Sequence, residues 1–275
     1  MSSNFWQETR VQTWRWFLHS KRRPIVVISG LMQPIIWMTL FVIVFKESMG
    51  ESYVVKHFFE GDYLSFVTPG ALLFTAFNAS LNAGVPILFD RELGFLDRIR
   101  SAPLDDRFSI VLASAIHIAV MTLLQCFVIV GATSILGVSF AGGLSGVMLG
   151  LLVLSLVILG FTSLSLGLAF MFKRHFEMLA VIMIITLPMI FLSSAFNSLA
   201  QLPAWLSNAV LFNPVTMAIE PLRLIYNSAD WTMLTVIYDS SLLGELNTWH
   251  FLGGLIAFNL LAANFCRKIL RKKLS

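Results

Sequence analysis

Charged residues are scarce in this chain of 275 residues. Asp, Glu, Lys and Arg make up 12% of it, whereas 57% of its residues are hydrophobic. A water-soluble domain usually has about 25% charged and about 45 to 50% apolar residues, so the composition excludes one. The net charge of only +4 gives no support to nucleic-acid binding. The two cysteines, Cys126 and Cys266, are too few for a disulfide framework or a cysteine metal site.

Motifs for catalysis and for nucleotide hydrolysis are missing as well. The sequence has no GxSxG, no HExxH and no pair of carboxylates inside its apolar runs, so the usual intramembrane enzyme sites are absent. No Gly-Lys dipeptide occurs, which excludes a Walker A phosphate loop. We therefore expect no cofactor site in this chain, and any active transport would draw its energy from another polypeptide.

Six apolar runs without Asp, Glu, Lys or Arg dominate the sequence. A bilayer core of about 30 Å needs about 20 helical residues, which these runs reach or approach. They lie at about 24–45, 63–89, 110–136, 143–172, 178–199 and 249–266. We predict an all-α integral membrane protein with six transmembrane helices, forming a single domain over 1–275.

Positive charge is concentrated on alternate connecting segments. Sixteen of the nineteen Lys and Arg residues lie before the first run, after the last run, or in the second and fourth loops. Because positive residues mark the cytoplasmic side, both termini are predicted to be cytoplasmic. The first run is too long for a signal-peptide core and is expected to be a retained anchor. An alternative architecture adds a half-buried hairpin in the fifth loop and leaves the termini unchanged.

Residues 5–20 have the pattern of an amphipathic helix. Opposite arcs would carry an apolar set, Trp6, Val11, Trp14, Phe17 and Leu18, and a polar set, Glu8, Gln12, Arg15 and His19. A basic helix rich in tryptophan beside a span is typical of the cytoplasmic membrane interface. Its role is either to anchor and orient the chain or to take part in gating.

The second loop combines charge with a phased apolar face. Over about 90–102 a helix would place Asp90, Arg91, Asp97 and Arg98 on one face and Leu93, Phe95, Leu96 and Ile99 on the other, and Pro103 would end it. A solvated loop needs no apolar face. We predict a docking surface for a cytoplasmic partner, with a merely interfacial helix as the alternative.

The fifth loop is apolar but interrupted by proline. Pro203, Pro214 and Pro221 divide it into pieces too short to span a membrane. Short external re-entrant or interfacial helices over about 203–227 fit this pattern. Glu220 and Arg223 are three residues apart and are expected to pair on one helix face.

The apolar runs contain no Asp, Glu, Lys or Arg, and apart from His250 at the start of the last run their one histidine is His117. Carriers coupled to protons or ions usually need buried ionisable residues, so secondary transport is disfavoured. His117 is either a proton site or a packing residue, and the packing role is favoured.

The complete layout resembles the type-2 ATP-binding-cassette membrane-subunit family, the permeases of exporters for drugs, lipids and polysaccharides. The family's second-loop pattern of an acid, a base, Glu-x-Gly, Arg and Ser-x-Pro corresponds to Asp90, Arg91, Glu92, Gly94, Arg98, Ser101 and Pro103. Its late pattern of Leu-Pro, Asn-Pro and a following Arg corresponds to Leu202, Pro203, Asn213, Pro214 and Arg223. The match is closest to the drug-resistance-type branch.

This resemblance implies a permease subunit of an ATP-driven exporter in a bacterial plasma membrane or an organelle membrane of bacterial origin. The residues from Asp90 to Pro103, Asp97 included, would form the ATPase-coupling helix. The external re-entrant motif would comprise Pro203, Asn213, Pro214, Glu220 and Arg223. Two such chains, as a homodimer or a mixed pair, would join two cytoplasmic ATPase subunits that hold ATP and Mg. A secondary carrier or channel and a membrane assembly factor are the alternative functions.

Overall fold

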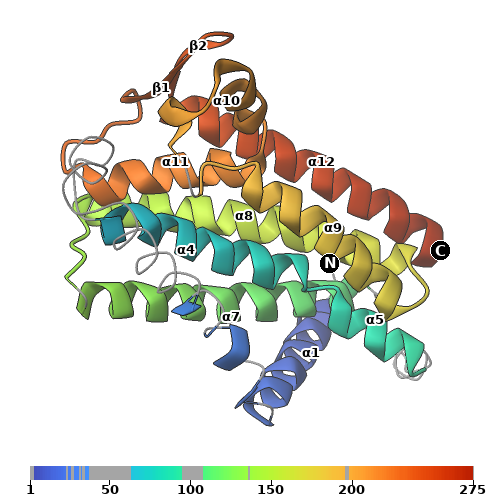
Figure 1. The fold of residues 1–275 in the computed structure, drawn as a ribbon. Helices are drawn as coiled ribbons and strands as arrows, with labels where there is room; N and C mark the ends of the chain where they lie inside the picture. The colour runs from blue at the N-terminus through green and yellow to red at the C-terminus, as the bar shows by residue number, and fades with distance from the viewer. Residues whose placement is uncertain are drawn as a thin grey trace.

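The computed structural model describes residues 3–22, 24–25, 28–30, 32, 35–36, 63–94, 108–135, 137–195 and 198–274, and most of this part is helical (Figure 1). The long helices run side by side. The helix α5 (Val85–Glu92) and the C-terminus lie at one end of the bundle. The opposite end carries a β-hairpin, so the two ends are built from different segments of the chain.

Four helical segments in the described ranges are long and apolar enough to cross a membrane: Ser65–Glu92, Ser109–Ile135, Gly143–Met171 and Thr248–Lys272. The helices α7 (Phe108–Ile135) and α8 (Gly143–Met171) cover nearly the same residues as the predicted runs at 110–136 and 143–172. Most of the first predicted run, 24–45, lies outside the described residues, so the count of six spans stays a prediction.

The second predicted run forms two helices instead of one. The helix α4 (Tyr63–Leu81) ends in a turn at 82–84, and α5 follows with Pro86 in its first turn, where a missing N–H is tolerated. Ser165 of α8 satisfies the backbone groups freed at this break. Its Oγ donates to the Leu81 carbonyl at 2.5 Å and accepts from the Gly84 N–H at 2.9 Å. The hydroxyl thereby holds the break against α8.

The last two predicted runs have different boundaries in the structure. The helix α9 (His175–Phe191) begins before 178 and ends well before 199. Near this end, the carbonyl groups of Met189 and Leu192 each accept a hydrogen bond of 2.7 Å from the side-chain amide of Asn213. The helix α12 (Thr248–Leu274) continues beyond 266, because its basic side chains can reach the water while the backbone stays helical.

The fifth loop contains two helices, α10 (Ala204–Leu211) and α11 (Pro214–Asn227), after a short 3₁₀ turn, η1 (Leu199–Gln201). It also contains an antiparallel hairpin of β1 (Val236–Ser240) and β2 (Gly244–Asn247). The described part of the chain is mostly helical, as predicted, and this hairpin adds two short strands to it. These strands are too short to give a pattern distinct from that of a loop. Leu246 of β2 packs with residues of α10 and α12 in a small apolar cluster.

The helix α8 lies at the centre of the bundle. Sixteen of its 29 residues are buried, and it contacts α4, α7, α11 and α12. Aromatic rings fill the space between it and its neighbours. Phe161 meets the ring of Phe77 edge-on at 4.7 Å and lies 4.8 Å from that of Phe258. The helices α4, α8 and α12 thus share one core.

Candidate coupling site

The last turn of α5 carries three consecutive charged residues, each bound to a different part of the chain. Asp90 is the first of them, and one of its carboxylate oxygens accepts from Arg15 of α1 (Ser3–Arg22) at 3.2 Å. Both side chains are partly exposed, so screening by water limits what this ion pair adds to stability. Its main effect is positional, because it connects the N-terminal helix to the end of the second span.

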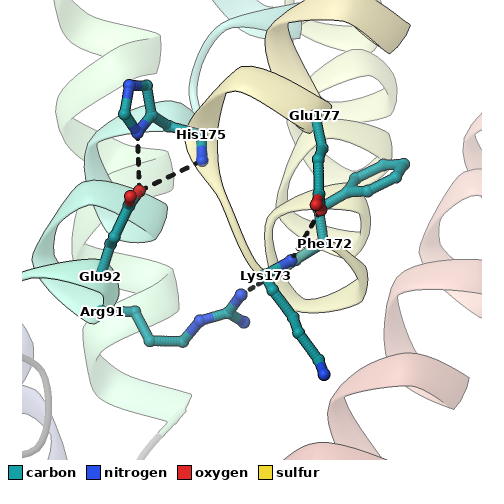
Figure 2. A network of polar contacts seen from close by, with 6 residues as sticks. All are labelled: Arg91, Glu92, Phe172, Lys173, His175 and Glu177. Carbon is teal, nitrogen blue, oxygen red and sulfur yellow. Dashed lines mark hydrogen bonds and ion pairs between the residues drawn. The ribbon is translucent and has the colours of Figure 1, made fainter.

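Arg91 and Glu92 bind the short connection between α8 and α9 (Figure 2). Arg91 donates from Nη2 to the backbone carbonyl of Phe172, the residue that follows α8. Glu92 accepts from the backbone N–H of His175 at 3.2 Å and lies 2.6 Å from the Nδ1 of the same residue. His175 is the first residue of α9, so a carboxylate at this helix N-terminus also interacts favourably with the helix dipole.

A ring contact and a local cap reinforce this connection. Phe89 of α5 stacks on the His175 ring with centroids 4.3 Å apart. Glu177, in the first turn of α9, accepts from the backbone N–H of Lys173 at 3.3 Å. The start of the second loop and the fourth loop, both predicted to be cytoplasmic, are therefore held together. Searched over the described ranges alone, the chain shows no cluster of His, Cys, Asp and Glu that could hold a metal.

The charged turn differs from the predicted coupling helix. Asp90 was predicted at the start of a helix over about 90–102, but in the structure it lies near the end of α5. Gly94 follows in a turn with φ of +71°, a conformation that favours glycine. Asp97, Arg98, Ser101 and Pro103 lie outside the described residues. Docking of an ATPase on this segment therefore stays a prediction.

The helix α1 covers the residues of the predicted helix at 5–20, and the structure shows which face packs inward. Its inward face consists of Phe5, Thr9 and Trp16, all buried. Trp6 and Trp14, from the predicted apolar arc, are exposed, as a helix at a lipid interface requires. Most of the predicted arc therefore points away from the neighbouring helix, α7, and Phe17 is the member that contacts it.

His117 of α7 contacts α1 through several groups. Its Nε2 lies 2.9 Å from the Ser20 hydroxyl, and its ring is stacked near Trp16 and meets Phe17 edge-on. A histidine with these neighbours joins two helices. The contacts favour the packing role over a proton site.

Four of the five predicted external motif residues lie on α11 or at its cap, and Pro203 is the exception. Pro203 is the residue before α10, and Pro214 is the first residue of α11. Asn213 caps α11 by accepting from the Val215 N–H at 2.9 Å. Through its amide the same side chain binds the end of α9. Asn213 thus connects two helices that sequence reasoning treats as separate.

The predicted ion pair on α11 is confirmed. Arg223 donates to Glu220 at 2.8 Å, and the two side chains are only 11% and 9% exposed. Arg223 also donates to the Ser194 carbonyl at 2.8 Å and lies over the Phe66 ring of α4 at 4.0 Å. Burial lowers the pKa of Arg223, and Glu220 opposes that shift. One buried cation therefore joins α11, the segment after α9 and the start of α4.

Sequence reasoning missed two residues at these sites. His175 lies in a very short polar loop between two apolar runs, and this loop was predicted on the same side as the second loop, so its position was the available signal. Ser165 lies in the middle of an apolar run, where a serine by itself indicates nothing. Both contacts cross more than 80 residues of sequence.

Comparison with known proteins matches residues 7–227 to the protein family described as "ABC-2 type transporter". The chain is 38% identical over 267 residues to "Putative transport permease ycf38" of Cyanophora paradoxa, which covers 97% of this chain and 90% of that protein. It is 35% identical over 269 residues to the protein of the same name from Pyropia yezoensis, and this alignment covers 98% of this chain and 90% of that protein. It is also 24% identical over 225 residues to "Daunorubicin resistance ABC transporter permease protein DrrB1" of Streptomyces coeruleorubidus, covering 76% of this chain and 71% of that protein.

Proposed function

The chain belongs to the ABC-2 type transporter family as a membrane permease subunit of an ABC transporter, and on that premise we propose that it exports an amphiphilic substrate. The substrate class comprises drugs, lipids and glycans. The daunorubicin-resistance permease among the relatives supports this class. Two copies of the chain, or this chain and a second permease, enclose the path in a bacterial plasma membrane or an organelle membrane of bacterial origin.

A separate cytoplasmic ATPase, with its own ATP and Mg, supplies the energy. The missing Walker A motif supports a separate source of energy. The observation that carries the proposal is the attachment of the charged turn of α5 to α1, to the end of α8 and to the start of α9. Force applied to the second loop by an ATPase would reach all three elements at once.

The proposal is tested by purifying the chain with its soluble ATPase and measuring ATP hydrolysis in lipid nanodiscs. We expect one of a panel of lipids, glycans and drugs to stimulate hydrolysis and to be transported only when ATP is present. Transport driven by an ion gradient without ATP would indicate a carrier. A complex that binds the ATPase but moves nothing would indicate an assembly factor.

Reversal of charge in the second loop should weaken ATPase docking. The double change of Arg91→Glu and Arg98→Glu is expected to reduce both ATPase binding and transport, since removing one partner of a buried hydrogen-bonded charge pair at an interface costs about 2 to 5 kcal/mol. Because Arg91 also contacts Phe172, Arg98→Glu alone separates docking from the internal contact. The control is Arg10→Glu on the exposed side of α1. If the double variant binds the ATPase and transports at the wild-type level, the second loop has no coupling role.

The predicted orientation gives a second test. Reporter domains fused after Glu51, Gly142 and Asp230 should be found outside the cell or organelle, because few cations lie in these loops. Reporters at the two termini should be cytoplasmic. A cytoplasmic signal from any of the three loops contradicts this topology.

A further inference from the structure

The helix α9 is held at both of its ends by polar contacts from distant parts of the chain. At its first residue, His175 binds Glu92 of α5. At its last turn and just beyond, the carbonyl groups of Met189 and Leu192 accept from Asn213, which caps α11. Figure 1 shows α9 running along the bundle from the region of α5 toward that of α10 and α11. The two contacts therefore lie at opposite ends of one helix.

Between its ends α9 has little packing against the bundle. Only Met178, Ile182 and Ile190 of its 17 residues are buried. Large apolar side chains along the rest of it are exposed, among them Phe176, Met183, Ile184, Leu187 and Phe191. A helix of this length extends over about 25 Å and is stiffened along its axis by its internal hydrogen bonds, one of which is missing in the last turn because Pro188 has no N–H. Such an element is positioned mainly by its ends.

The segment that follows the external end of α9 contacts the buried side chain of Arg223. After Leu192 the chain reaches Ser194, whose carbonyl accepts from Arg223 and whose N–H donates to Thr216 of α11. Through Arg223 this segment is connected to the start of α4 as well. Any shift of α9 along its axis therefore acts on α11 and α4 together.

We propose that α9 is a strut that transmits displacement of the cytoplasmic charged turn to the external helix α11. Glu92 and Asn213 are the positioning residues at its two ends. This goes beyond the proposed function, which places the input of energy but not the response of the external side. The strut can be tested without the ATPase, so either proposal can fail alone.

The test measures hydrogen exchange of backbone amides by mass spectrometry on the full chain in lipid nanodiscs. Glu92→Gln removes the carboxylate that binds His175. We expect exchange in 192–195, at the far end of α9, to rise about fivefold or more, the lower end of typical coupling between distant sites. The matched control is Glu177→Gln. This change also removes one negative charge near the start of α9, but Glu177 contacts only the Lys173 N–H among the bonds described above, within the α8–α9 connection. That control should leave exchange in 192–195 unchanged.

The reciprocal variant is Asn213→Asp. Aspartate keeps the cap on α11, because Asn and Asp are similar N-caps, but it has no amide to donate to Met189 and Leu192. Coupling is reciprocal, so exchange in 175–178 at the cytoplasmic end should rise by a similar factor. If each variant loosens only its own end, the strut is excluded. If one variant fails to fold, the far-end exchange of the other decides alone.

Discussion

Replacing Gly84 with alanine is expected to destabilise the chain strongly and to abolish transport. A Cβ at this position would lie 2.4 Å from the backbone oxygen of Ser165 and 2.9 Å from the Cβ of Ala169. The close atoms belong to the backbone and to a short side chain, so no rotamer change relieves the clash. Overpacking usually costs about 1 to 3 kcal/mol, and here it also displaces the Ser165 hydroxyl from the break between α4 and α5.

Thermal unfolding in nanodiscs and transport by the assembled complex check this expectation. Gly131→Ala is the matched control, because nothing lies within 4 Å of a Cβ at that position of α7. Alanine is favoured over glycine inside a helix by about 1 kcal/mol, so the control should be neutral or stabilising. If Gly84→Ala unfolds at the wild-type temperature, the close packing of the break against α8 is wrong.

The length of the apolar runs predicted α7 and α8 within a few residues, since a bilayer core fixes the length of a span. Run length did not predict the helix bounds at positions where polar groups inside the protein, and not the edge of the bilayer, end or break a helix. The break before α5 contains Gly84 and Pro86, which are turn residues, but a search for uncharged runs passes over them. The end of α9 depends on Asn213, which belongs to another helix.

Sequence periodicity identified side chains that share a helix, but not their partners on other helices. The pair of Glu220 and Arg223 was predictable because residues three apart on a helix are neighbours. Asp90, Arg91 and Glu92 were also assigned to the predicted coupling helix. Their partners, however, lie on α1, after α8 and on α9, and only the packing of the helices brings them together. Periodicity along one helix carries no such information.

Replacing Arg223 is also expected to lower the stability of the chain strongly. In Arg223→Met the Glu220 carboxylate stays buried without its cation, and breaking a buried ion pair from one side costs about 3 to 5 kcal/mol. The change also takes away the donor to the Ser194 carbonyl and the cation over the Phe66 ring. Thermal unfolding should show the loss, and transport should fall because the segment after α9 keeps its bond from the Ser194 N–H to Thr216 of α11 but loses the one from Arg223.

The double change of Glu220→Gln and Arg223→Met separates the cost of an unpaired charge from the loss of contacts. A neutral pair needs no compensating ion, so the double variant should be more stable than Arg223→Met alone. Glu245→Gln, at an exposed position of β2, removes an acid from the same loop and should leave stability within about 0.5 kcal/mol of the wild type. A double variant no more stable than Arg223→Met would mean that the unpaired Glu220 carboxylate costs little, and that the loss in both variants comes from the contacts with Ser194 and Phe66, which both lack. The stabilising role of the pair would then lie in connecting α11 to α4 and to the segment after α9.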